Sequence, residues 1–245
     1  MDDPTNFIND SGDSNEADVV VFAEDRTEPA QYASLPGDYA HDVALNFINR
    51  SNDVNNSQVV IFARNVATDF NELAIAWQVI RNCGQGWNHP FVYPMNQTIG
   101  ASDSWGNFTP QTSASRGQLF AVERTSSGDQ LIAQGSATGP NEIQLLNALP
   151  QGAVTANIYK DGKLFATKTA IAPGQKAVFE FKPTIWIGVV SQIDEGSVIN
   201  AAIISDINTE ISLLGIASAD IVMTGGGSGP NARPFAFSLQ NVVMV

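Results

Sequence analysis

The stretch NFINRSNDVNNSQVVIFA, residues 46–63, decides the fold of this 245-residue chain. It joins a short segment, NFIN, to a five-residue apolar segment, VVIFA, through a loop rich in Asn, Asp and Ser. β-Branched and aromatic residues in short runs are typical of strands, whereas Asn, Asp and Ser are typical of turns. The stretch therefore predicts two strands joined by a polar turn, which we interpret as a β-hairpin.

The same stretch occurs forty residues earlier as NFINDSGDSNEADVVVFA, residues 6–23. Eleven of the eighteen positions are identical, without a gap. Solenoid folds need three or more repeats to bury a continuous face, and the sequence has no third copy. We interpret the repeat as a local duplication whose first copy can extend a sheet or pair with a neighbouring molecule.

Short apolar runs separated by turn signals continue through the rest of the chain, and they predict an all-β fold. Residues 160–163, Lys-Asp-Gly-Lys, are typical of a type I′ hairpin turn between two such runs. Residues 70–81 have an acid, Glu72, near their start and Arg81 at their end, as helices do, but their apolar residues do not share one helical face. We therefore predict an antiparallel β-sandwich, of jelly-roll or Greek-key type.

The composition changes near residue 42. Residues 24–42 contain Pro29, Pro36 and Gly37 with little apolar periodicity, which is typical of a linker. We predict an N-terminal extension over residues 1–42, which carries the duplicated hairpin, and a β-sandwich domain over residues 43–245. A boundary near residue 150 would instead divide that domain into two smaller sandwiches.

The charge of the chain is uneven. The net charge is −13, and residues 1–40 hold ten acids against Arg26, which leaves −9 in that segment. All five lysines lie between residues 160 and 182. Lys160 and Lys163 are therefore candidate contacts for the acidic segment of a neighbouring molecule. Nucleic acid is excluded as a partner, because phosphate binding needs many basic residues.

The sequence indicates no cofactor, metal site or membrane span. Cys83 is the only cysteine, and no run of about 18 apolar residues exists. The oxygen-rich loop at residues 10–18 lacks the order of an EF-hand, so we interpret it as a turn that bonds its own backbone. The chain begins without a basic and then apolar segment, so we expect it to be cytoplasmic, or exported without a recognisable signal peptide.

No catalytic residue can be assigned from sequence. Cys83 and His89 are only six residues apart, and no Gly-X-Ser-X-Gly nucleophile motif occurs. The glycine-rich stretch at residues 225–229 lacks the lysine of a phosphate-binding loop. We expect a protein that is not an enzyme, with a β-sandwich hydrolase as one alternative.

Two loop-like segments combine aromatic and polar residues, as carbohydrate sites do. The candidate ligand-binding residues are Trp87, Asn88, His89, Tyr93, Asp103, Trp105 and Asn107. In the alternative interpretation, these tryptophans simply cover the ends of the sandwich. A carbohydrate-binding, lectin-like module is therefore one alternative function, with a glycan as partner.

The repeat points first to a self-assembling structural protein. In this hypothesis the first copy adds to a sheet edge of a neighbouring subunit by β-augmentation, and the contact propagates into an oligomer or filament. The candidate assembly residues come from the first copy and from the lysine-rich stretch: Asn6, Phe7, Ile8, Asn9, Val19, Val20, Val21, Phe22, Lys160 and Lys163.

Overall fold

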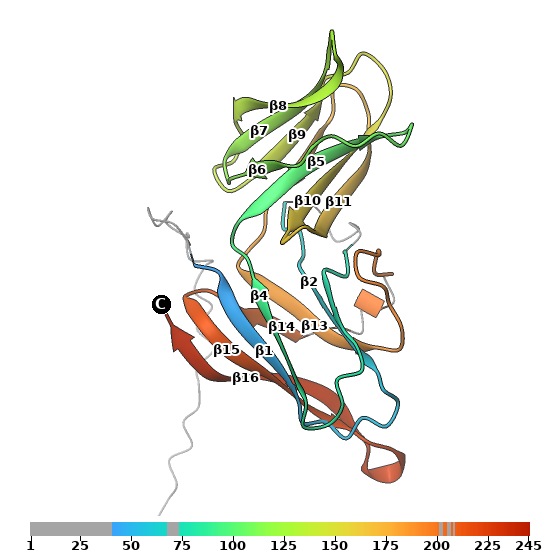
Figure 1. Ribbon diagram of the computed structural model, residues 1–245, viewed down its shortest axis with the longest axis vertical. Coiled ribbons are helices and arrows are strands. Elements are labelled where there is room, and N and C mark those ends of the chain that lie inside the picture. Colours follow the sequence, from blue (N-terminus) through green and yellow to red (C-terminus); the bar gives the residue numbers. More distant parts are fainter. Residues whose placement is uncertain (1–40, 68–73, 201–202, 205–206, 208) are drawn as a thin grey trace, which may run out of the picture. The chain divides into compact units, whose positions relative to one another are not determined.

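The computed structural model describes residues 41–67, 74–200, 203–204, 207 and 209–245. The described elements are sixteen β-strands and one three-residue 3-10 helix, η1 (Gly229–Asn231). The prediction of an all-β fold is therefore confirmed. The strands form four sheets of four strands each (Figure 1).

The first two sheets combine strands from both ends of the described chain. Sheet 1 has the order β16 (Arg233–Met244), β15 (Ile216–Gly226), β1 (Val43–Asn49) and β4 (Asn88–Tyr93). Sheet 2 has the order β14 (Thr209–Ser212), β13 (Thr184–Val190), β2 (Gln58–Phe62) and β3 (Gln78–Ile80). We call this pair of sheets the first sandwich.

The other two sheets come from the middle of the chain. Sheet 3 has the order β11 (Lys163–Ile171), β10 (Val154–Lys160), β5 (Gln97–Asp103) and β6 (Thr112–Ala114). Sheet 4 has the order β12 (Lys176–Phe179), β9 (Ile143–Asn147), β7 (Gln118–Thr125) and β8 (Gly128–Ser136). We call this pair the second sandwich.

The second sandwich is an insertion in the first. All of its strands lie between β4 and β13 in the sequence (green to yellow in Figure 1). Residue 150, where the sequence suggested a boundary, lies in the loop between β9 and β10, inside this insertion.

The structure corrects the prediction of a hairpin at residues 46–63. β1 pairs with β15 and β4, whereas β2 pairs with β13 and β3. The two strands therefore lie in different sheets and form a β-arch. Sequence alone did not distinguish the two motifs, because the partners of both strands come from distant parts of the chain.

The sequence suggested purely antiparallel sheets, but two pairs of the described strands are parallel. β1 pairs with β15 in parallel, with Phe47 opposite Ile221, and β7 pairs with β9 in parallel. Parallel neighbours require a long crossover connection. In the first sandwich, that crossover includes the whole of the second sandwich.

The two sandwiches share one hydrophobic core, and aromatic rings join them. The Trp77 ring packs edge-on against Tyr93 and Phe165, with centroid distances of 5.5 and 5.9 Å. The indole nitrogen of Trp77 also donates a hydrogen bond to the carbonyl of Lys160. This cluster fixes the point at which the chain leaves β4 and enters β5.

Lys160 places a titratable group in this cluster. Its side chain is only 4% exposed, and its ammonium donates to the carbonyl of Pro94 and lies 4.6 Å from the Tyr93 ring centroid. Burial lowers the pKa of Lys160 from 10.5 to about 8; the charge of Asp42 raises the pKa and that of Arg116 lowers it further.

We expect the contribution of Lys160 to stability to increase as the pH rises from about 8 to about 10. In this window the folded chain has released a proton that the unfolded chain still binds. The free energy of unfolding, measured with urea, should therefore rise relative to Lys160→Met by up to about 1.4 kcal/mol per pH unit. If the difference in unfolding free energy between the unaltered chain and Lys160→Met stays constant from about pH 8 to about pH 10, the lowered pKa of Lys160 is contradicted.

Candidate assembly site in the β1–β2 arch

Polar side chains close the loop of the arch. The Asn49 Oδ1 atom accepts hydrogen bonds from the backbone N–H and the hydroxyl of Ser51, at 2.9 and 2.6 Å. The Asp53 carboxylate accepts from the backbone N–H groups of Asn55 and Ser57, at 2.9 and 2.7 Å. Such Asx turns fix the path of the chain from one sheet to the other. The loop of the second copy thus bonds its own backbone, whereas the loop at residues 10–18, for which the same was expected, lies outside the described residues.

A row of polar side chains crosses all four strands of sheet 1. Asn88 donates to Asn46 at 2.9 Å, Asn46 donates to Asp220 at 2.9 Å, and Asn241 donates to Asp220 at 2.6 Å. These hydrogen bonds, first from Asn241 and then from Asn46, lower the pKa of the Asp220 carboxyl. Asn46 thus connects β1 to both of its neighbours.

The apolar residues of the arch lie in two layers. Phe47, Val59 and Ile61 belong to the large core, whereas Val60 and Phe62 belong to a second cluster. β2 is therefore covered on both faces, as its continuous apolar run predicted.

The two copies of the repeat differ almost only where the second copy is exposed or half-buried. Of the eleven identical positions, seven are buried in the second copy and three are half-buried; only Asn55 is exposed. Of the seven differing positions, six are exposed or half-buried: Arg50, Asn52, Val54, Asn56, Ser57 and Gln58. The seventh, the buried Ile61, is replaced conservatively by Val21. The first copy therefore keeps the side chains that an arch of this kind needs.

The likeness ends where the arch meets the rest of the domain. Asp3 and Thr5 occupy the positions that correspond to the buried Val43 and Leu45. On the other side, Glu24 corresponds to Arg64, whose guanidinium stacks 3.7 Å from the centroid of the Trp186 ring. In place of Val43, Asp3 would bury a charge, which is unfavourable, and in place of Arg64, Glu24 would lose the stacking on Trp186. Residues 43–65 therefore fit the β1–β2 position of the first sandwich better than the first copy would.

Most candidate assembly residues, from Asn6 to Asn9 and from Val19 to Phe22, lie outside the described residues. The two candidate lysines are described, and both make contacts within the chain. Lys160 is buried, and Lys163 donates to Gln78 at 2.6 Å and forms an ion pair with Glu195 at 3.1 Å. Lys160 thus does not contribute to an exposed basic surface.

Among the described residues, the first sandwich has no further strand beyond either of its two sides, and these sides differ in their capacity to accept one. On one side the edge strand is β4, in which Pro90 lies opposite Asn46 of β1. Proline has no backbone N–H, so β4 offers one hydrogen-bond donor fewer to an added strand. On the other side, β16 has no proline from Phe235 to Met244. Its inward-facing side chains, Phe235, Phe237 and Leu239, pack against the core but stay half-buried, because the sheet ends there. The β16 side is therefore the better acceptor.

The candidate ligand residues divide between the two sandwiches. Trp87, Asn88, His89 and Tyr93 lie in or next to β4, and Tyr93 is 1% exposed, so its ring is not available to a ligand. Asp103 ends β5, and Trp105 and Asn107 follow it in the loop to β6. The structure therefore does not gather these residues around one site. Phe108, which is 72% exposed beside Trp105, was missed, because an isolated phenylalanine is usually a core residue.

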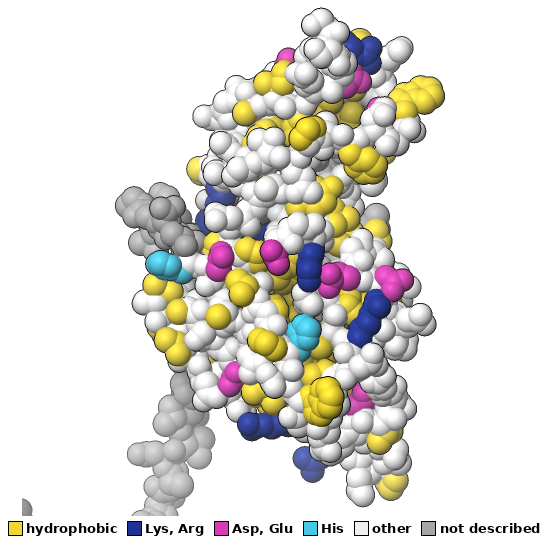
Figure 2. All heavy atoms as spheres, in the orientation of Figure 1, with side chains coloured by type: hydrophobic (Ala, Val, Ile, Leu, Met, Phe, Trp, Pro, Cys, Tyr) yellow, Lys and Arg dark blue, Asp and Glu magenta, His cyan; other side chains and the backbone are white. Residues whose placement is uncertain are grey.

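On the face that Figure 2 shows, backbone and uncharged polar side chains cover most of the surface, and charged side chains are scattered among them. Among these residues, no group of three or more His, Cys, Asp or Glu side chains is arranged to hold a metal ion. The part of the chain that the structure describes also has no helix that is long and apolar enough to span a membrane. Comparison with protein-family models, with curated proteins and with solved structures finds no match to this chain.

We expect Phe47→Ala to reduce the free energy of unfolding by about 3–5 kcal/mol, because Phe47 is fully buried at the centre of sheet 1. Phe7→Ala is the matched control, because it makes the same change at the corresponding position of the first copy. In dilute solution this variant should unfold like the unaltered chain in a urea titration. Equal destabilisation by the two variants would contradict the assignment of the core position to the second copy.

Proposed function

We propose that this protein is a structural protein that assembles with copies of itself through residues 6–23. The observation that carries the proposal is the match between the two copies at buried and hydrogen-bonding positions. Phe and Val at these positions stabilise a protein when they are packed in a core, and Asn does so when it forms hydrogen bonds. Their presence in the first copy is explained if this copy also packs into a sandwich. The first copy is therefore suited to supply strands to a sandwich of the kind that β1 and β2 complete.

The acceptor in this proposal is the β16 side of the first sandwich of a neighbouring molecule. The neighbour's own β1–β2 site is already occupied by residues that fit it better. A sheet edge, by contrast, offers unpaired backbone N–H and C=O groups along its length, and a strand added there by β-augmentation needs no exchange. The half-buried Phe237 and Leu239 would gain cover from the added strand.

The arch geometry refines the way in which the first copy would bind. An arch supplies one strand to each of two facing sheets, whereas a hairpin supplies both strands to one sheet. β16 packs against β13 of sheet 2, and β14 is the neighbouring open edge of that sheet. Residues 6–9 would extend sheet 1 beside β16, and residues 19–23 would extend sheet 2 beside β14. Because donor and acceptor are different surfaces, the contact is head-to-tail and favours open chains of molecules.

Deletion of residues 1–40 tests the proposal. Every described strand lies within residues 43–245, so the shortened chain should keep its fold, which circular dichroism can verify. We expect light scattering to show oligomers for the full chain and monomers for the shortened chain at the same concentration. Oligomers of unchanged size after the deletion would refute the proposed function.

Ala236→Glu tests the acceptor side. Ala236 is exposed on β16, and a glutamate there would repel the acidic segment of the incoming molecule. Ala133→Glu is the matched control, since Ala133 is exposed on β8, the edge strand of sheet 4. Sedimentation velocity should show weaker self-association for Ala236→Glu only. Equal effects of the two substitutions would place the acceptor elsewhere.

A further inference from the structure

The loop between β5 and β6 presents two aromatic rings to solvent. Trp105 is 86% exposed and Phe108 is 72% exposed. Both belong to the second sandwich, which takes no part in the proposed self-association. Two large exposed apolar side chains only three residues apart in one loop are unusual, and exposed apolar groups that gather on a surface often mark binding sites.

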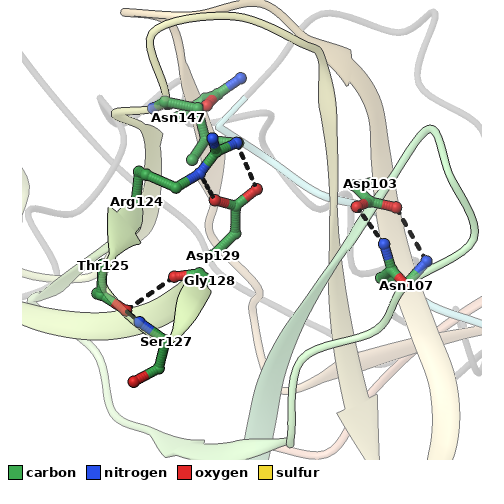
Figure 3. Close-up of polar contacts among 9 residues, drawn as sticks. Asp103, Asn107, Arg124, Thr125, Ser127, Gly128, Asp129 and Asn147 are labelled. Carbon is green, nitrogen blue, oxygen red and sulfur yellow. Dashed lines mark hydrogen bonds and ion pairs between the residues drawn. The ribbon is translucent and has the colours of Figure 1, made fainter.

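A network around Asp103 holds this loop in place (Figure 3). The Asp103 Oδ1 atom accepts hydrogen bonds from the backbone N–H groups of Trp105 and Asn107, both at 2.9 Å. The Oδ2 atom accepts from the side-chain amide of Asn107 at 2.8 Å. These bonds lower the pKa of the Asp103 carboxyl, and the Asn107 side chain contributes most. The rings are therefore carried by an ordered turn, which reduces the entropy lost on binding.

A shallow hollow of about 60 Å³, open to solvent, lies beside the loop; Phe108 lines it, and Trp105 is three residues away in the same loop. Its apolar lining comes from strands of both sheets of the second sandwich and from the loops beside them: Ala101, Phe108, Val122, Leu149 and Val154. Polar groups at the hollow belong to Ser102, Asn107 and Thr109. The Asn107 Oδ1 atom and the Thr109 hydroxyl hydrogen have no partner among the described residues, so an acceptor and a donor remain for a ligand.

Two carboxylates lie at the hollow, and one of them is paired with a cation. Both oxygens of Asp103 are used by its own loop. The Asp129 carboxylate, which also lines the hollow, accepts hydrogen bonds from two nitrogens of the Arg124 guanidinium (Figure 3). A free phosphate or carboxylate group would find no cation among the described residues at the hollow that is not already paired, and Asp103, whose partners are neutral amides, would repel it. The hollow instead suits a neutral ligand with a flat apolar face and hydroxyl groups.

We propose that the β5–β6 loop and the hollow beside it together bind a pyranose ring of a neutral carbohydrate. The apolar face of the sugar lies against the rings of Trp105 and Phe108, and its hydroxyl groups bond to Asn107 and Thr109. This combination of an apolar surface with a few directed polar groups gives both affinity and orientation. Asp103 acts as a positioning residue, because it holds the loop without contacting the sugar.

An array of neutral glucose, mannose, galactose and xylose oligosaccharides, with anionic glycans on the same slide, tests this site in the full-length protein. The sugar that is retained most strongly is then titrated by calorimetry. Trp105→Ala should weaken binding about tenfold, as expected for an exposed aromatic anchor, with the melting temperature unchanged. Phe108→Ala should weaken binding in the same direction.

Trp87→Ala is the matched control, because Trp87 is a second exposed indole, 68% exposed, in the first sandwich. Its removal should leave the affinity for the sugar unchanged. Retention of no neutral oligosaccharide, equal loss with Trp87→Ala, or equal retention of anionic glycans would each overturn the proposal. Deletion of residues 1–40 should leave sugar binding intact, so this site and the self-association can fail independently.

Discussion

The central position of the β1–β2 arch is the constraint on which the first sandwich depends. β1 lies between β15 and β4, and β2 lies between β13 and β3, so one continuous segment supplies an inner strand to each of two sheets. Every other strand of this sandwich pairs directly with one arch strand or with a neighbour of one. The loop of the arch must therefore have a fixed length and path, which explains why Asn49, Ser51 and Asp53 are bonded so closely.

The sequence predicts well what depends on local chemistry. Many strand positions follow from the short apolar runs, although residues 88–93, which were expected to be loop-like, form β4. The turn at residues 160–163 follows from Asp-Gly, and Asp161 and Gly162 indeed have positive φ angles of 52° and 70°. The closure of the arch loop by its own side chains also follows from its residue types. In each case the atoms that decide the structure are within a few residues of one another.

What the sequence does not predict depends on contacts between distant residues. The arch and the hairpin share the same local pattern, and only the pairing of β1 with residues 218–223 separates them. Lys160 looks like a surface residue, because a lysine beside a turn is usually solvated. It is buried because the turn of the inserted sandwich packs against Trp77 and Tyr93. Tyr93 cannot contact a ligand for the same reason, since its packing against Trp77 and Lys160 buries its ring.

The insertion separates the two proposed roles of the chain. The second sandwich leaves the first after β4 and returns at β13, and its sheets are formed from its own strands alone. The β5–β6 loop can therefore vary without changing the pairing of β1, β15 and β16. Loops on a fixed framework tolerate such change, and they commonly carry binding residues. Under the proposed functions, each subunit of an assembly held together by its first sandwich would present one copy of the aromatic loop. Many weak sugar contacts would then act together, since linked sites gain affinity from their high effective concentration.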